Sequence, residues 1–420
     1  MLNNRISQLV ALASRYSLRL FIAAVAFAAL FYSLYDLCFA PAYPIGDWLI
    51  NYSDGFVRRG LIGEFILLAA HATHIPPAWL GVIVPLTIYY LFLLGVYRLA
   101  APLRRGPLWY AMIFSPAALA FMILCPFNAV RKEMLAPATL TAVIFLLRRK
   151  PSALVLCLTI TVFFAVMVLS HESAYCCFPY FFAAIALATR DLRYAAKIMV
   201  VPFIVAALFF ALTVLHPGDR SAAIAICHSV GGHWLGDDDF RNLCSGAILR
   251  VGFTAAIVRH EVTTILRYWP LYAVLAVLSL APYIAALVVL YKRDGLRFEV
   301  KVISSIAALS ALASSALFYF GMDWGRWIQM QILCLLLVIL MAAQHAPSFQ
   351  PGAKVRPLGQ GRPWRIPLLI AVFLYCTCWT LPVLGWQNVH FGYLSLPRFL
   401  VRDFRNIYRT HAWQTIDRGW

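Results

Sequence analysis

The residues of this chain that could take part in chemistry include basic side chains that lie beside apolar segments. Five of them lie within a few residues of a long apolar run: Arg58, Arg59, Arg131, Lys132 and Arg326. An arginine fork binds two phosphate oxygens at once, and the glycines around Arg58 and Arg59 let backbone approach a ligand closely. The pattern predicts a site for an anionic group such as a diphosphate. The alternative is that these bases pair with nearby carboxylates or reach lipid headgroups.

Acidic residues and one histidine are candidates for a general base. His171 and Glu172 are adjacent where two apolar segments meet, and partial desolvation there can tune such a group towards a neutral pKa. Asp47 and Asp54, in the first polar segment, are competing candidates. Each could remove the proton of an attacking hydroxyl. The alternative is that His171 caps a helix and Glu172 neutralises an arginine.

Three further residues are predicted to support the site: Glu133, Asp323 and Trp324. Asp323 and Arg326 flank Trp324 and Gly325, so Asp323 is the expected partner of Arg326. Trp324 lies where tryptophans commonly form an interfacial belt, and stacking on a sugar ring is the alternative.

Two of the ten cysteines, Cys227 and Cys244, share the long polar segment 216–268. Their spacing allows a disulfide in an oxidising compartment. A zinc site that also uses His228 and His233 is an alternative, but the spacing matches no familiar zinc finger. We therefore predict a disulfide, and neither a metal nor a cofactor.

Apolar runs recur along the whole chain and define its fold class. The chain has 420 residues, of which 63% are hydrophobic and 12% charged, and its mean hydropathy is +0.79. Runs of about 20 residues cross the hydrocarbon of a bilayer as helices. The sequence predicts an all-α, polytopic transmembrane helical bundle that forms a single integral-membrane domain over 1–420. About eleven spans are expected, at 18–40, 77–99, 108–126, 134–147, 152–170, 173–189, 197–215, 269–291, 302–320, 327–344 and 366–386.

Charge divides the connecting segments into two sets. With a cytoplasmic N-terminus, the inner segments hold twenty of the 35 bases and three of the 17 acids, a net charge of about +17. The outer segments hold fifteen bases and fourteen acids, a net charge of about +1. Because positive residues in short loops stay cytoplasmic, we predict the N-terminus inside and the C-terminus outside. No soluble segment carries a basic face with interleaved aromatics, so we predict no nucleic-acid partner.

Three outer segments stand out by length and composition. The first outer loop, 41–76, ends in an apolar stretch too short to span, which is expected to be interfacial or re-entrant. The segment 216–268 is a large outer loop. The tail, 388–420, alternates basic and apolar residues at helical spacing and predicts an amphipathic helix on the outer leaflet.

The chain is similar to integral-membrane glycosyltransferases in four respects. It has many predicted spans, arginines in outer segments, Asp47 and Asp54 in the first outer loop, and one enlarged outer loop. It resembles the Wzy-type polysaccharide polymerases and the wider GT-C group. The resemblance implies metal-independent glycosyl transfer from an undecaprenyl-diphosphate-linked glycan, at the periplasmic face of a bacterial inner membrane, in O-antigen or exopolysaccharide assembly. The implied partners are the lipid-linked oligosaccharide, membrane lipids and other polysaccharide-assembly proteins.

Two other functions stay open. One is a transporter or flippase of a lipid-linked glycan, and the other is an acyl or other group transferase that modifies a surface glycan. Transporters commonly carry charged residues near the membrane midplane, and the two halves of their chain are commonly structural repeats of each other. The span centres here are nearly free of charge and the halves show no repeat, which favours an enzyme with a one-sided site.

Overall fold

The fold is helical throughout the described residues of this computed structural model. These residues are 2–39, 44–125, 130–232, 243–253, 255–350 and 365–382. Apart from helices and turns, they contain one isolated bridge, between Ser53 and Gly55. The all-α fold expected from the sequence is therefore confirmed for this part of the chain, while the tail 388–420 lies outside it.

Seven helices in the described ranges are long and apolar enough to cross a membrane. They are α1 (Leu2–Phe39, apolar over Tyr16–Cys38), α4 (Pro77–Ala100), α8 (Ala153–Ser170), α10 (Leu192–Leu215), α13 (Trp269–Lys292), α14 (Arg297–Phe320) and α15 (Trp324–Ala343). Their length and composition are those of membrane spans.

Shorter helices occupy the other four predicted spans, so the count of about eleven is not confirmed. They are α5 (Pro107–Ile113), α6 (Phe121–Leu124), α7 (Leu135–Leu147), α9 (Phe178–Thr189) and α16 (Arg365–Thr377). The range 108–126 is not one continuous helix, because the chain turns at Ser115 and Pro116 between α5 and α6. This irregular backbone is buried and tied down: Tyr283 donates a hydrogen bond of 2.9 Å to the Met112 carbonyl.

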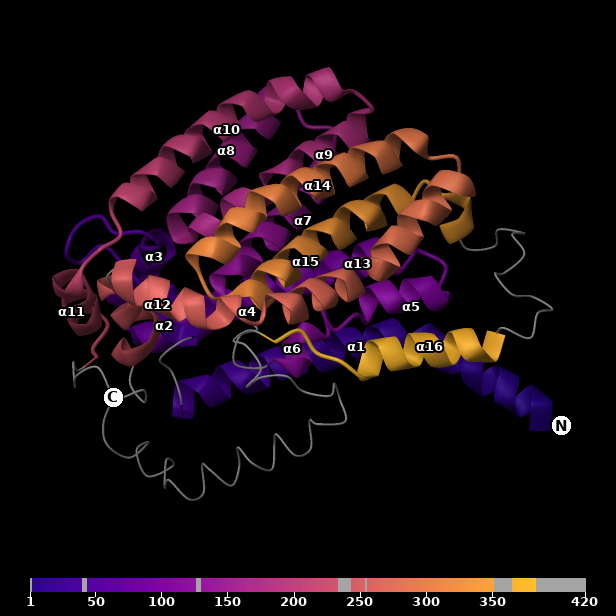
Figure 1. Ribbon diagram of the computed structural model, residues 1–420, viewed down its shortest axis with the longest axis horizontal. Helices are drawn as coiled ribbons and strands as arrows, with labels where there is room; N and C mark the ends of the chain where they lie inside the picture. The colour runs from indigo at the N-terminus through magenta and orange to yellow at the C-terminus, as the bar shows by residue number, and fades with distance from the viewer. Residues whose placement is uncertain are drawn as a thin grey trace.

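Helix α15 forms the centre of the bundle. Of its most apolar stretch, 89% is buried, against 28% for α10 and α14. It packs against α7, α9, α13 and α14, as Figure 1 shows. A helix that is apolar all round is buried all round, so the first turn of α15 brings Arg326 into the interior.

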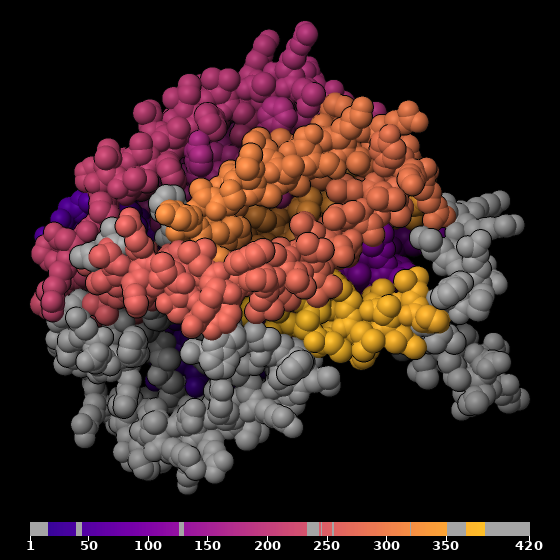
Figure 2. Space-filling model, viewed as in Figure 1, coloured from indigo at the N-terminus to yellow at the C-terminus, as the bar shows by residue number. Residues whose placement is uncertain are grey.

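The outer helices present apolar side chains to their surroundings. In the view of Figure 2, α10, α13, α14 and α16 cover much of the visible face. Their large exposed side chains include Leu208, Val277, Leu312 and Phe373, each more than 60% exposed. Such a surface is expected of helices that face lipid.

Four short helices gather at one end of the bundle: α2 (Pro44–Leu49), α3 (Leu61–Thr73), α11 (Arg220–Ser229) and α12 (Ala255–Leu266) (Figure 1). The start of α1 lies at the opposite end. Helix α3 is formed by the apolar stretch at the end of the first outer loop, which the sequence predicts to be interfacial or re-entrant. It packs on α4 and α8, with Phe65 and Leu68 exposed.

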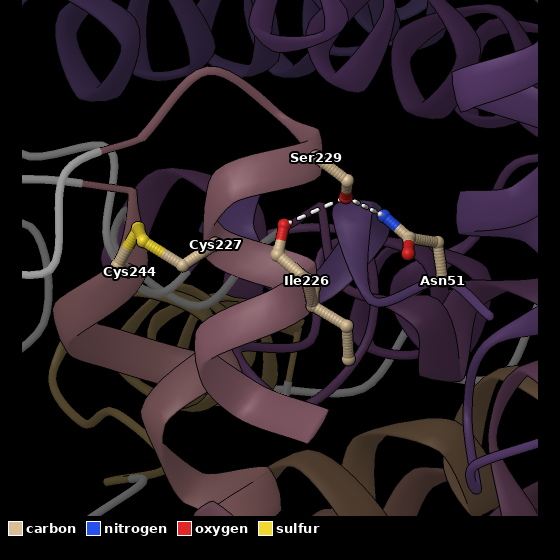
Figure 3. The surroundings of a disulfide bond; sticks show 5 residues. All are labelled: Asn51, Ile226, Cys227, Ser229 and Cys244. Atoms are coloured by element: carbon tan, nitrogen blue, oxygen red, sulfur yellow. Dashed lines mark hydrogen bonds between the residues drawn. A yellow bond between two sulfur atoms is a disulfide. The ribbon is translucent and has the colours of Figure 1, made fainter. Parts of the chain in front are cut away.

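A disulfide and a hydrogen bond fix α11 at this end (Figure 3). Cys227 of α11 is joined to Cys244 at the start of η4 (Cys244–Ile248), as the sequence predicts. Asn51 donates a hydrogen bond of 2.9 Å to Ser229, which in turn donates to the Ile226 carbonyl. The large polar segment is thereby tied to the segment that carries Arg58 and Arg59. The remaining short elements are η2 (Lys132–Met134), η3 (Glu172–Cys177), η5 (Leu249–Gly252) and η6 (Pro347–Phe349).

Candidate functional site

Nine residues singled out in the sequence meet in one cluster, which we call the charged network. Its members are Asp47, Arg59, Arg131, Lys132, Glu133, His171, Glu172, Asp323 and Arg326. They come from α2, the loop before α3, the start of η2, the junction of α8 with η3, and the start of α15.

The consecutive residues Arg131, Lys132 and Glu133 are the centre of the network. All three are at most 5% exposed. Arg131 Nε donates to Asp47 Oδ2 over 3.1 Å, and Lys132 Nζ donates to the Arg59 carbonyl over 2.6 Å. Glu133 Oε1 lies 2.8 Å from Nη1 of Arg326. Each residue of the triplet therefore connects to a different segment of the chain.

Arg59 and Glu172 form the second part of the network. Arg59 Nε donates to both carboxylate oxygens of Glu172, over 3.1 Å and 2.9 Å, and Arg59 Nη2 donates to Oε1. The Arg59 backbone is left-handed, with φ at +67°. Helix α3, which follows this loop, is pressed against the preceding segment at Gly63, where a β-carbon would lie 1.9 Å from the Ile50 carbonyl oxygen. Only glycine allows this approach.

His171 lies between Glu133 and Ser173. Its Nδ1 is 2.7 Å from the Ser173 hydroxyl, and its Nε2 is 3.6 Å from Glu133 Oε1. The ring is 3% exposed, so it belongs to the interior part of the network.

Arg326 is held at the first turn of α15 by two acids. Its Nη2 pairs with Asp323, the partner expected from the sequence, and its Nη1 faces Glu133. Trp324 is buried, donates a hydrogen bond of 2.8 Å to the Gly321 carbonyl, and packs edge-on against Phe318. Trp324 therefore supports the turn from inside the protein.

Burial and neighbouring positive charges have opposite effects on the pKa values of two carboxylates in this network. Burial alone would raise the pKa of Asp47, but Arg131 and Lys132 hold it below its usual range. Burial likewise would raise the pKa of Glu172, yet Arg59 keeps it well below the usual range. Both carboxylates are thus charged at neutral pH.

The pKa values of the two basic groups of the interior are also lowered, but here burial is the cause. Burial lowers the pKa of Lys132 to about 8, although Asp47 favours the charged form. Burial also lowers the pKa of His171, against the pull of Glu133, so the ring is neutral at pH 7.

Several buried polar atoms of the network have no hydrogen-bond partner among the described residues. They are Asp47 Oδ1, both carboxylate oxygens of Glu133, and Nε and Nη1 of Arg326. The contact of Glu133 with Arg326 is close but not aligned as a hydrogen bond. Buried polar atoms normally find partners, so the network has capacity for a bound water or a substrate group.

Two predicted site residues lie outside the network's contacts. Asp54 is exposed and accepts a hydrogen bond of 3.1 Å from Ser221 of α11, which places it among the surface residues. Arg58 adjoins Arg59 and is partly exposed, and its guanidinium forms no hydrogen bond or ion pair with a described residue. Its main-chain amide is bonded to the His216 carbonyl over 2.9 Å.

The sequence reasoning missed Asp36. This carboxylate lies in α1, is 3% exposed, and lines a small cavity with Trp48 and Val130. Arg131 is close enough to act on it electrostatically, and Asp36 Oδ1 has no hydrogen-bond partner among the described residues. An acid within an apolar span was the available signal.

In its described part, the chain holds no group of three or more His, Cys, Asp or Glu residues with metal-binding geometry. The partly exposed forks of Arg58 and Arg59 could hold an anion, and a nearby carboxylate or imidazole could accept a proton. No protein-family model, curated protein or solved structure matches the chain.

Proposed function

We propose that this protein is a membrane glycosyltransferase of the polysaccharide polymerase type, acting on an undecaprenyl-diphosphate-linked glycan. The observation that carries the proposal is the position of Arg58. Its guanidinium forms no hydrogen bond or ion pair with a residue that the structure describes, and it adjoins the Arg59–Glu172 ion pair at the partly exposed edge of a buried network. A lipid-linked diphosphate brings its charged group to such a site while its polyprenyl chain stays in the bilayer.

Charge balance supports anion binding at Arg58 rather than deeper in the network. Arg131, Arg326 and Arg59 each face a carboxylate of the network. Glu172 is close enough to act on Arg58 electrostatically, but its carboxylate is bonded to Arg59, so Arg58 favours a further anion. Arginine is suited to this task because its fork binds phosphate oxygens in pairs.

The same edge supplies the elements of glycosyl transfer. Arg58 and Arg59 would hold the diphosphate and oppose the charge that grows as it leaves. Glu172, which is bonded to Arg59, is the candidate base nearest to these arginines, and His171 adjoins it in the chain. Asp47 is fully buried against Arg131, and Asp54 is bound to Ser221 on the surface, so both are less suited to reach the acceptor.

The disulfide supports a site on the outer side of a bacterial inner membrane. Cys227 and Cys244 lie at the end of the bundle that carries α2 and α3, and disulfides persist in oxidising compartments. The basic loops, which the positive-inside tendency assigns to the cytoplasm, include Arg148–Lys150 and Arg190–Arg193 at the other ends of α8 and α10. In this orientation the donor glycan meets the network after it has crossed the membrane.

The test compares lipid-linked glycans in cells that carry Arg58→Ala, His171→Ala or Lys292→Ala, with protein amounts matched by immunoblot. Arg58→Ala is a clean variant because it leaves no carboxylate unpaired among the described residues. Lys292→Ala is the control, since this exposed lysine ends α13 far from the network in the chain. We expect single lipid-linked units to accumulate and polymer to disappear in the first two variants and not in the control.

The membrane leaflet on which single lipid-linked units accumulate distinguishes a transferase from a flippase. Units that accumulate on the outer leaflet, where an added lectin reaches them in spheroplasts, support the transferase. Units that accumulate on the inner leaflet would instead make this protein a transporter. Normal polymer in Arg58→Ala and His171→Ala would remove both residues from catalysis and contradict the proposal.

A further inference from the structure

The Arg59–Glu172 pair differs from the interior ion pairs because water reaches it. The side chains of Arg59 and Glu172 are 28% and 18% exposed, whereas those of Arg131 and Asp47 are 6% and 0% exposed. Arg58 adjoins Arg59 in the chain and is close enough to Glu172 for the two charges to interact. A phosphate drawn to Arg58 therefore also meets the fork of Arg59, which Glu172 occupies.

We propose that a phosphate of the lipid-linked diphosphate displaces Glu172 from Arg59, and that the released Glu172 carboxylate is the general base of the transfer. This inference rests on the proposed function. Phosphate and carboxylate compete for the same planar fork, because each offers two oxygens to its paired N–H groups. Arg58 favours the exchange, since two adjacent guanidinium groups attract the more highly charged anion more strongly.

Displacement changes the basicity of Glu172. In the resting protein burial would raise its pKa, but Arg59 keeps the pKa well below the usual range and the carboxylate is a weak base. Once Arg59 faces the phosphate, burial is opposed by less positive charge, so the pKa of Glu172 rises. The base is therefore strong only when the donor substrate is bound.

The transfer step is balanced by these groups. Glu172 takes the proton of the acceptor hydroxyl while the acceptor oxygen bonds to the anomeric carbon of the donor. The bond from that carbon to the diphosphate oxygen breaks, and its electron pair stays on the diphosphate, which Arg58 and Arg59 face. Glu172 then gives the proton to water and can pair with Arg59 again.

Glu172→Gln separates binding from transfer. The neutral amide competes weakly for Arg59, so the variant is expected to bind undecaprenyl diphosphate about tenfold more tightly than the wild type. The same variant is expected to lose transfer and to accumulate single lipid-linked units in cells. Affinity is measured in lipid nanodiscs, with undecaprenyl monophosphate as the reference ligand. A carboxylate with only a structural role would not produce tighter binding together with lost transfer.

Glu261→Gln is the matched control. It removes a partly exposed carboxylate from Arg250, which pairs with both oxygens of Glu261 outside the charged network. Its affinity for undecaprenyl diphosphate is expected to stay within about twofold of the wild-type value.

Unchanged or weaker diphosphate binding by Glu172→Gln would overturn the inference. Glu172→Asp provides a second test if the Gln variant does not fold. The shorter carboxylate is expected to bind the diphosphate more tightly and to keep part of the transfer, and unchanged affinity there would overturn the inference equally. A wild-type protein that does not prefer the diphosphate to the monophosphate contradicts the proposed function itself, so the two failures are distinguishable.

Discussion

Lys132 Nζ donates a hydrogen bond of 2.6 Å to the main-chain carbonyl of Arg59, whose backbone has a φ of +67°. A left-handed conformation costs a residue with a β-carbon about 1 kcal/mol or more, so it needs support from its surroundings. The buried ammonium of Lys132 supplies that support. Lys132 therefore determines the direction in which the Arg59 side chain leaves its loop towards Glu172.

Replacing Lys132 by methionine should impair transfer by freeing the Arg59 backbone. A catalytic group displaced by about 1 Å can lose roughly 100-fold in rate, and we expect a loss of that order in Lys132→Met. The measurement is the ratio of polymer to single lipid-linked units in cells, with folding checked by size-exclusion chromatography. Lys292→Met is the control, and transfer within twofold of wild type in Lys132→Met would contradict this role.

The lowered pKa of Lys132 predicts a specific pH dependence of stability. The folded protein releases this proton near pH 8 and the unfolded chain releases it near 10.5. Between these values the unfolded chain binds more protons, so the stability contributed by Lys132 rises with pH, by on the order of 2 kcal/mol. Denaturant unfolding in mixed micelles at pH 8 and pH 10 measures this. The wild type should gain stability relative to Lys132→Met over this interval, and a constant difference would refute the assignment.

The buried pair of Asp47 and Arg131 should be strongly coupled. Removing one member leaves a buried charge with less compensation, so Asp47→Asn and Arg131→Gln should each lower the free energy of unfolding by about 3–5 kcal/mol. The double variant should lose less than the sum of the two single losses. A double-mutant cycle of unfolding free energies measures the coupling, and strict additivity would show that the contact contributes nothing.

Reduction of the Cys227–Cys244 disulfide should destabilise the protein. The two cysteines are 17 residues apart in sequence, and closing a loop of that length contributes about 3 kcal/mol. Dithiothreitol should therefore lower the unfolding midpoint of the wild type and leave that of the doubly substituted Cys227→Ser, Cys244→Ser protein unchanged. Cys157→Ser is the control, and it should respond to the reductant as the wild type does.

Gly63→Ala should disrupt the loop that carries Arg58 and Arg59. The added β-carbon would lie 1.9 Å from the Ile50 carbonyl oxygen, which is main chain and cannot rotate away. We expect poor folding or loss of transfer. Gly106→Ala is the control, because its β-carbon meets nothing within 4 Å and its φ of −136° suits alanine. Equal transfer by the two variants, measured as polymer per folded protein, would contradict the close approach.

Composition and charge predicted much of this molecule. Long apolar runs such as 77–99 and 269–291 form long helices, because a run of that length has few other stable arrangements in a bilayer. The pairing of Asp323 with Arg326 followed from their local spacing. The disulfide was predictable because Cys227 and Cys244 share one polar segment.

Other features depend on contacts between distant segments, which one sequence does not specify. Nothing in the amino-acid pattern favours Glu172 over Asp54 as a partner for Arg59, since both are carboxylates in segments predicted to be outer. Packing decides between them: Glu172 faces Arg59, whereas Asp54 faces Ser221. The break at Ser115 and Pro116 was missed because the surrounding residues are apolar enough for a span. Asp36 was missed because Arg131, whose charge acts on it, comes from far along the chain.

The contact of Arg326 with Glu133 has a consequence for biogenesis. Glu133 is synthesised early, but its arginine partner lies in the first turn of α15, almost two hundred residues later. At synthesis rates of about 5–20 residues per second, this leaves Glu133 without that partner for roughly 10–40 s. A nascent chain that stalls or is truncated before α15 keeps an unneutralised acid among its helices, which marks it as unfinished to the chaperones and proteases of membrane quality control.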